Sequence, residues 1–268
     1  MKLVNNQDYL EAGELFESSL VLSKSYDREH YSPSFLKQWS QCPAKGILDI
    51  IFEKKSPALE IGSKVHELLE DYYKNNMTEE QLLELCKSEN LNMEFFDACR
   101  VKEYIKSYLT IPDYINNLKD AQHLTEEQIV LDVSPMGVAL PVKLKGIIDR
   151  IDIINGIYVV DYKTTSRRIT NDMYLHQMII YKWLVEERIG SEIDGIYIAA
   201  IHKDSSEYIK QNISLTNQSK LIDKIFEIDE EVIDSIDTRC YKKKRGDHCK
   251  WCPLKDNCSD KLILEVKE

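Results

Sequence analysis

The chain has 268 residues, of which 43% are hydrophobic and 30% are charged, a composition typical of folded globular proteins. It has only 9 glycines and 7 prolines, which excludes long flexible linkers, and it lacks the run of about 20 apolar residues needed to span a membrane. The net charge of −11 argues against a protein that coats nucleic acid, although local charge governs a binding groove. Because the N-terminal segment has acids where a signal peptide needs an apolar block, we expect a cytoplasmic protein.

The first predicted elements are helices. Ser32 is a plausible N-cap and Pro33 suits the first position of a helix, which we expect to end at Cys42. A second helix is predicted over about 59–75, because apolar residues recur there at three- and four-residue spacing. Residues 78–120 have the composition and spacing of further helices.

The pattern changes near residue 127, where strands begin. Asn155-Gly156 is a strong hairpin signal between two apolar strands. The predicted elements are, in chain order, strands at 128–133, 140–154 and 157–160, a helix at 170–189, strands at 195–202 and 207–213, and a helix at 216–237. This order predicts an α/β core with an N-terminal helical elaboration.

Two carboxylates and a lysine follow this hairpin pattern. Asp161 ends an apolar strand, where an ionised side chain is costly unless it is paired or bound to a metal. Lys163 lies two residues on and therefore shares a strand face with Asp161, while Asp149 lies on the neighbouring strand. Such a cluster suits Mg²⁺ or Mn²⁺. The alternative is an ordinary surface salt bridge between Asp161 and Lys163.

The same residues resemble a known motif. Gly146-Ile-Ile-Asp149-Arg-Ile-Asp and Val160-Asp-Tyr-Lys-Thr164 resemble the signature of the PD-(D/E)xK nuclease superfamily, in the form found in its RecB-like family. Gly62-Ser-Lys-Val-His66 resembles the family's G-x-x-x-H helix, and Gln177-Met-Ile-Ile-Tyr181 resembles its Q-x-x-x-Y helix. The resemblance implies a restriction-endonuclease-like core, in which a mixed central sheet is flanked by helices.

The resemblance also implies roles for single residues. The implied metal ligands are His66, Asp149, Asp161 and the main-chain carbonyl of Tyr162. The implied catalytic residues are His66, Asp149, Asp161 and Lys163, and the implied substrate contacts are Gln177 and Tyr181. Without it, a lone helical histidine is more often a solvated or packing residue, and Gln177 and Tyr181 are a packing pair on one helix face. Glu127, just before the first strand, is a further candidate for the acidic cluster.

The cysteines form a second pattern. Cys249, Cys252 and Cys258 have C-x2-C-x5-C spacing, which lets three thiolates grip one metal centre. Cys42, in a similar Cys-Pro context, is the preferred fourth ligand, and Cys240 is its rival. In a cytoplasmic chain a disulfide framework is not expected, so the choice lies between zinc and an iron–sulfur cluster.

This cysteine layout resembles the iron–sulfur subset of the same nuclease group, which includes CRISPR-associated RecB-like exonucleases and the AddB nuclease domain. The resemblance implies a [4Fe–4S] cluster bound by Cys42, Cys249, Cys252 and Cys258. The cluster would fasten the C-terminal segment to the N-terminal helix and bring the basic run Lys242-Lys-Lys-Arg245 to DNA.

We therefore expect a DNA exonuclease that uses Mg²⁺ or Mn²⁺ and acts on single strands or ends in recombination, repair or CRISPR adaptation. The expected regions are a helical one at 1–125, a nuclease core at 126–238 and an iron–sulfur segment at 239–268. Its partners would be DNA and recombination or CRISPR-adaptation proteins, and a homo-oligomer stays open. The alternatives are a non-catalytic subunit that binds DNA ends and an adaptor stapled by zinc.

Overall fold

The structure is a computed structural model, and it describes residues 30–46, 57–170, 172–238, 242 and 244–252. The chain divides into two compact units, each built from segments that are distant in sequence. The first unit contains 1–54, 132–144 and 215–268, and the second contains 55–131 and 145–214. The three regions expected from the sequence follow chain order, and they stay a prediction.

Four helices open the second unit. They are α4 (Pro57–Lys74), α5 (Glu79–Leu85), α6 (Ser88–Leu91) and α7 (Phe95–Leu109). Thr78 and Gln81 start α5 with a capping box, in which the side-chain oxygen of each residue accepts a hydrogen bond from the backbone N–H of the other. The predicted helix near 59–75 and the further helices after residue 78 are therefore confirmed.

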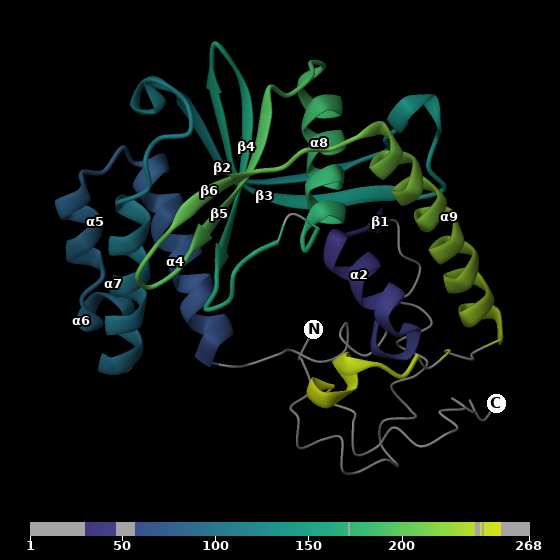
Figure 1. Cartoon of the computed structure of the whole chain (residues 1–268), viewed down its shortest axis with the longest axis horizontal. Helices are drawn as coiled ribbons and strands as arrows, with labels where there is room; N and C mark the ends of the chain where they lie inside the picture. Colours follow the sequence, from purple (N-terminus) through teal and green to yellow (C-terminus); the bar gives the residue numbers. More distant parts are fainter. Residues whose placement is uncertain (1–29, 47–56, 171, 239–241, 243, 253–268) are drawn as a thin grey trace. The chain divides into compact units, whose positions relative to one another are not determined.

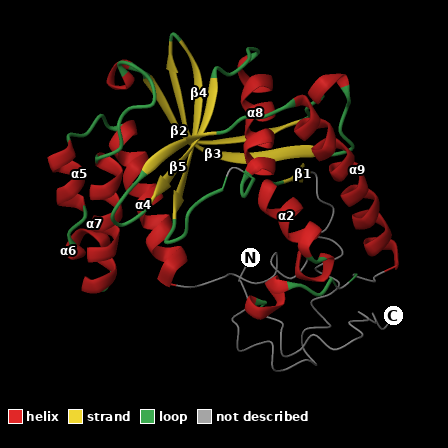
Figure 2. Cartoon of the chain, viewed as in Figure 1, coloured by secondary structure: helices red, strands yellow, loops and turns green. Residues whose placement is uncertain are grey.

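The second unit is organised around a mixed sheet. Its strands are β2 (Gln122–Leu131), β3 (Lys143–Ile154), β4 (Gly156–Thr164), β5 (Gly195–Ile201) and β6 (Glu207–Lys210). Strands β3, β4, β5 and β6 are neighbours in that order, and β2 pairs with β3. The β4–β5 pair is parallel, whereas β3–β4 and β5–β6 are antiparallel. The expected mixed sheet flanked by helices is confirmed (Figure 2).

The connection from β4 to β5 is a crossover helix, α8 (Leu175–Ile189). Within this unit, α4 and α7 lie on one side of the sheet and α8 lies on the other (Figure 1). Every residue of β5 is buried, as its place between β4 and β6 in a covered sheet requires. Gly190 follows α8 in the left-handed conformation, so the helix ends where the sequence predicted, although it begins at Leu175 and not at residue 170.

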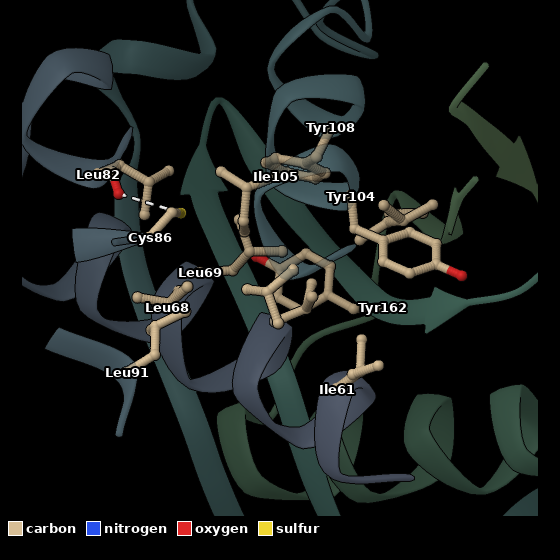
Figure 3. Close-up of a cluster of buried hydrophobic side chains, with 14 of the residues drawn as sticks. Ile61, Leu68, Leu69, Leu82, Cys86, Leu91, Tyr104, Ile105, Tyr108 and Tyr162 are labelled. Atoms are coloured by element: carbon tan, nitrogen blue, oxygen red, sulfur yellow. Dashed lines mark hydrogen bonds between the residues drawn. The ribbon is translucent and has the colours of Figure 1, made fainter. Parts of the chain in front are cut away.

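The main hydrophobic core of this unit joins α4 and α7 to the sheet (Figure 3). Ile61, Val65 and Leu69 line one face of α4 at helical spacing and are at most 2% exposed. They pack in one cluster with Ile105 of α7 and Tyr162 of β4. Consequently, one face of α4 is held against the strand that carries the predicted D-x-K motif.

The predicted hairpin between β3 and β4 is confirmed. Asn155 has a φ of 36°, in the left-handed region that tight hairpin turns of this kind require. The register pairs Arg150 with Val160, so Asp149 and Asp161 occupy the next positions along the two strands. The turn thus determines which acids face each other across the hairpin.

Among the residues that the structure describes, the first unit contains two helices and two short 3₁₀ turns from segments that are distant in sequence. They are α2 (Pro33–Gln41), α9 (Leu215–Thr238) and the short 3₁₀ turns η3 (Pro135–Gly137) and η4 (Asp247–Trp251). β1 (His30–Tyr31) pairs in parallel with Lys143 and Leu144, the first two residues of β3, which belong to the first unit. Ser32 caps α2, accepting a hydrogen bond from the Phe35 N–H at 3.3 Å, as predicted. Trp39 of α2 is fully buried and donates to Glu231 of α9.

The boundaries of some strands and helices differ from those predicted. β2 begins at Gln122, six residues before the predicted start, and the predicted strand at 207–213 ends at Lys210. The start of β2 was missed because its polar side chains bond to buried groups, as His123 does with Asp152. In the part of the chain that the structure describes, no helix is long and apolar enough to cross a membrane.

Candidate active site

The residues of the two predicted motifs meet at adjacent strands of the second unit. Asp149 is 7% exposed and Asp161 is 1% exposed, so both carboxylates are buried. The Tyr162 N–H donates to Asp149 Oδ2 at 2.6 Å, and His66 Nδ1 lies 3.4 Å from Asp149 Oδ1. Lys163 Nζ lies 2.5 Å from Asp161 Oδ2. The structure therefore brings together His66, both aspartates and the lysine.

Asp161 and Lys163 form an ion pair, as the alternative interpretation of the sequence proposed, but Asp161 is not on the surface. Its Oδ2 atom faces the Lys163 ammonium, and its Oδ1 atom accepts a hydrogen bond from Gln177 Nε2 at 2.9 Å. The Lys163 side chain is itself only 19% exposed. A carboxylate with 1% exposure needs such partners to remain ionised, so the surface interpretation is wrong.

Sequence reasoning missed one acid of the cluster, Glu126. Ligand atoms of His66, Glu126 and Asp149 all lie within 4.8 Å of one another. The sequence pointed instead to the neighbouring Glu127. Glu126 lies inside β2 with a φ of 50°, a left-handed residue that interrupts the alternation of a strand. An alternating pattern cannot reveal such an irregularity.

Burial and neighbouring charges perturb every titrating group of the cluster. Burial raises the pKa of Asp161 to about 6, and the Lys163 ammonium only partly opposes this. Burial would also raise the pKa of Asp149, but the hydrogen bond and charge of His66 outweigh it and lower that pKa. Burial would lower the pKa of His66, but Asp149 outweighs it and raises that pKa.

Burial and neighbouring charges also shift the pKa values of Glu126 and Lys163. Burial and the nearby charge of Asp149 raise the pKa of Glu126. Burial would lower the pKa of Lys163, but Asp161 and Asp149 outweigh it and raise that pKa, so the ammonium stays charged. With three carboxylates gathered around one ammonium and one imidazole, the cluster carries surplus negative charge that a cation would relieve.

The cluster opens into a cavity of about 670 Å³. His66, Glu126, Asp149 and Lys163 line it, together with residues from the start of α4. A Cβ on Gly62 would lie 3.0 Å from Thr164 Oγ1, so glycine at this position lets α4 approach the end of β4. The glycine of the G-x-x-x-H motif thereby helps to place His66 beside the two strands.

These residues fit a divalent cation. Carboxylate oxygens with one imidazole nitrogen are a ligand set suited to Mg²⁺ or Mn²⁺. Asp161 Oδ2 is buried and, within the described part of the chain, its only partner is the ion pair with Lys163, which does not have hydrogen-bond geometry. That oxygen keeps a lone pair available for a cation.

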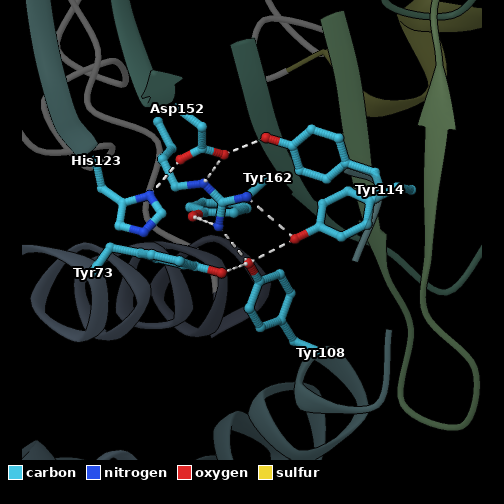
Figure 4. A network of polar contacts seen from close by, with 8 residues as sticks. Tyr73, Tyr108, Tyr114, His123, Asp152 and Tyr162 are labelled. Carbon is cyan, nitrogen blue, oxygen red and sulfur yellow. Dashed lines mark hydrogen bonds and ion pairs between the residues drawn. The ribbon is translucent and has the colours of Figure 1, made fainter. Parts of the chain in front are cut away.

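Arg150 lies next to Asp149 in the chain, and its side chain is fully buried. It takes part in a network of polar contacts that includes Tyr108, Asp152 and Tyr162 (Figure 4). Its guanidinium donates to Asp152 Oδ2 at 3.0 Å, to the Tyr108 hydroxyl at 2.7 Å and to the Tyr162 hydroxyl at 3.1 Å. Its Cζ atom also stacks 3.9 Å above the centre of the Tyr73 ring. This network, which the sequence analysis did not identify, anchors β3 immediately beside the acid cluster.

Asp152 completes the same network. Besides Arg150, it contacts His123 Nδ1 at 2.5 Å and accepts a short hydrogen bond from the Tyr114 hydroxyl. His123 thus packs in this network, in contact with Asp152 and the Tyr73 ring. The two charged side chains that follow Asp149 in the motif therefore stabilise the strand and do not line the cavity.

The predicted cluster cysteines belong to the first unit. Cys42 is buried, and its thiol lies 4.0 Å from the Lys242 carbonyl, which also accepts from the Ala44 N–H at 3.2 Å. Cys249 and Cys252 are half-buried, whereas Cys258 and Cys240 lie outside the described residues. Among the described residues, the three cysteines do not gather at metal-ligand spacing, so the iron–sulfur cluster stays a prediction.

The PD-(D/E)XK nuclease superfamily matches residues 30–259 of the chain. A solved structure from Eubacterium rectale, of a protein assigned as an exonuclease, aligns with a TM-score of 0.54 and 16% identity over 83% of this chain and 88% of that one. The structure of SSO0001 aligns with a TM-score of 0.42 and 16% identity over 91% and 97%. Among curated proteins, none matches the chain significantly.

Proposed function

Because the chain belongs to the PD-(D/E)XK nuclease superfamily, we propose that it is a metal-dependent DNA exonuclease of the RecB-like type. One observation carries the proposal beyond the family. The cluster of His66, Asp149, Asp161 and Lys163 is complete, buried at its base and open to a cavity. A subunit that only binds DNA does not require a complete ionisable cluster, whose burial is costly without a catalytic use.

The proposed metal ligands are His66, Asp149 and Asp161, with the main-chain carbonyl of Tyr162. Glu126 joins them as a ligand or as an acceptor close to the metal, because its carboxylate lies beside His66 and Asp149. When bound, Mg²⁺ or Mn²⁺ would acidify a water molecule and stabilise negative charge on the phosphate. The Tyr162 N–H holds the Asp149 carboxylate in place for this role.

Lys163 supplies the remaining positive charge. Its ammonium stays protonated between two carboxylates and lines the cavity that a phosphate would enter. There it would orient the attacking water or neutralise a phosphate oxygen as the phosphorus–oxygen bond breaks. In the overall hydrolysis, the hydroxyl of water passes to phosphorus and its proton passes to the departing sugar oxygen.

We place the [4Fe–4S] cluster at Cys42, Cys249, Cys252 and Cys258, where it would fasten the C-terminal segment to α2. Support comes from the first unit, in which the Lys242 carbonyl of the C-terminal segment accepts hydrogen bonds from the Cys42 thiol and the Ala44 N–H, just after α2. The proposed biological setting is DNA recombination, repair or CRISPR adaptation, with single strands or DNA ends as substrate.

The experiment for exonuclease activity compares two substrates in Mn²⁺: linear single-stranded DNA labelled at either end, and a closed single-stranded circle of the same sequence. The linear strands should shorten progressively, and the label released first gives the polarity. The circle should resist. If circle and linear strands are cut equally fast, the enzyme is an endonuclease. If neither is cut although DNA binds tightly, the nuclease proposal fails.

A further inference from the structure

We infer that Gln177 is a positioning residue for the Asp161 carboxylate and not a substrate contact, and that Tyr181 and Gly146 hold it in place. The inference rests on the proposed function, since Asp161 is a metal ligand only in that account. It reassigns the Q-x-x-x-Y motif of α8, for which the resemblance implied substrate contact. The motif becomes part of the metal site.

The hydrogen bonds of Gln177 leave its amide nitrogen no capacity for a phosphate. An amide nitrogen has two hydrogens. Gln177 Nε2 donates one to Asp161 Oδ1 at 2.9 Å and the other to the Tyr181 hydroxyl at 2.8 Å. The opposite orientation would place the amide oxygen against a carboxylate oxygen, so the chemistry of the pair determines which atom faces Asp161.

Tyr181 lies one helical turn beyond Gln177 and is 6% exposed. Its ring packs directly over Gly146 of β3, where an added Cβ would lie 2.8 Å from Leu184 Cδ1 and 3.1 Å from Tyr181 Cε1. An added Cβ would push the Leu184 and Tyr181 side chains aside, so glycine at this position favours the close approach of α8 to β3. The first glycine of the G-x-x-D motif and the tyrosine of Q-x-x-x-Y are in contact.

The consequence is an Asp161 side chain held through both oxygens. Oδ1 is held by the Gln177 amide and Oδ2 by the Lys163 ammonium. Hydrogen-bond partners that orient a ligand without touching the metal typically change metal affinity by about 10–100-fold. We therefore expect Gln177 to act on metal binding, whereas a substrate contact would act on DNA binding.

The test uses the full chain and measures two quantities: the Kd for Mn²⁺ by calorimetry without DNA, and the KM for linear single-stranded DNA. For Gln177→Ala, the Kd for Mn²⁺ should rise about tenfold. Its KM at saturating Mn²⁺ should stay within about twofold of wild type, and added Mn²⁺ should restore the cleavage rate. Glu187→Ala, an exposed position on the same helix, is the matched control and should change neither quantity.

Two further variants keep the test decisive. Gln177→Met keeps the length of the side chain but removes the amide that donates to Asp161, and it should weaken Mn²⁺ binding about as much as alanine. Tyr181→Phe removes only the hydroxyl that holds the amide and should produce a smaller change in the same direction. Circular dichroism and the thermal midpoint of each variant identify any that fail to fold.

The results separate this inference from the proposed function. A raised KM for DNA with an unchanged Kd for Mn²⁺ would overturn the positioning role and support substrate contact. Unchanged values for both quantities would overturn it as well. Wild-type protein that binds Mn²⁺ without cutting DNA would refute the nuclease alone, while the Gln177 effect on Mn²⁺ binding would remain. No Mn²⁺ binding by the wild type would overturn both.

Discussion

Arg150 and Asp152 form an ion pair with neither side chain exposed, the guanidinium Nε lying 3.0 Å from the carboxylate. The pair sits between Tyr108 and Tyr162 on one side and His123 on the other. Buried charges of this kind are costly to isolate, because the remaining partner loses both water and its counter-ion. The pair therefore stabilises the strand from which Asp149 projects.

Replacing Asp152 tests whether the ion pair with Arg150 stabilises the fold. Asp152→Ala leaves the Arg150 guanidinium buried and without its carboxylate, and should lower the free energy of unfolding by about 3–5 kcal/mol. Urea denaturation followed by circular dichroism measures the change. The matched control is Asp194→Ala at the far end of the hairpin, which removes an exposed hydrogen bond to the Ile157 N–H and should cost about 1 kcal/mol. A loss below about 1 kcal/mol for Asp152→Ala would show that the pair does not stabilise the fold.

Glu126 and Glu127 are adjacent in β2, and only the first approaches His66 and Asp149. Glu126→Gln should therefore weaken Mn²⁺ binding about tenfold or more, since it removes a carboxylate from the cluster. Glu127→Gln makes the same chemical change one residue away and should have no effect. Calorimetric titration with Mn²⁺ compares the two. An unchanged affinity in Glu126→Gln would place Glu126 away from the metal, and an equal or larger effect of Glu127→Gln would contradict the distinction that the structure makes.

The affinity for Mn²⁺ should depend on pH, because protons compete with the metal for its ligands. The pKa of Asp161 is raised to about 6, and that of His66 is raised above 6.5. As pH falls through these values both groups take up protons, so affinity should fall by up to about tenfold per pH unit for each group. Binding near neutral pH should release a proton from His66.

Calorimetry in buffers with different ionisation enthalpies measures the released protons. His66→Asn is the control, since it removes the imidazole and should abolish its share of the proton release. Affinity that is constant between about pH 5 and 8 would contradict the assignment of Asp161 and His66 as ligands.

Substitutions can distinguish Cys42 from Cys240 as the fourth ligand of the proposed cluster. Cys42→Ser should lose iron and visible colour, because Cys42 lies buried beside the C-terminal segment. Cys240→Ser should retain both. Cys86→Ser is a control for a buried cysteine in the second unit, where the thiol donates to the Leu82 carbonyl. Iron and sulfide content decide the outcome, and wild-type protein with zinc in place of iron would contradict the cluster.

Much of the site was predictable because hairpin geometry is local. The Asn155-Gly156 turn determines the register of β3 and β4, and this register makes Asp149 and Asp161 neighbours. Strand alternation then placed Lys163 on the same face as Asp161, as the ion pair shows. These relationships depend only on residues within one short stretch of chain.

Other contacts could not be predicted from the sequence, because they join segments that are far apart in the chain. Tyr108 and Tyr208 meet Arg150 from separate elements, and no local spacing reveals three-dimensional neighbours of that kind. The position of Glu126 depends on one left-handed residue within a strand, which alternation cannot anticipate. The hydrogen-bond partners of Gln177 could not be predicted from the sequence, because they depend on how α8 packs against β3 near Gly146.

The central claim is that this acid and lysine cluster is a nuclease active site, and the most direct test is the cleavage rate of Lys163→Ala at saturating Mn²⁺. Loss of the ammonium leaves the carboxylates and should preserve or strengthen Mn²⁺ binding, because a nearby positive charge is removed. Cleavage of linear single-stranded DNA should fall about 10²–10³-fold. A variant that binds Mn²⁺ and cuts at the wild-type rate would contradict the claim.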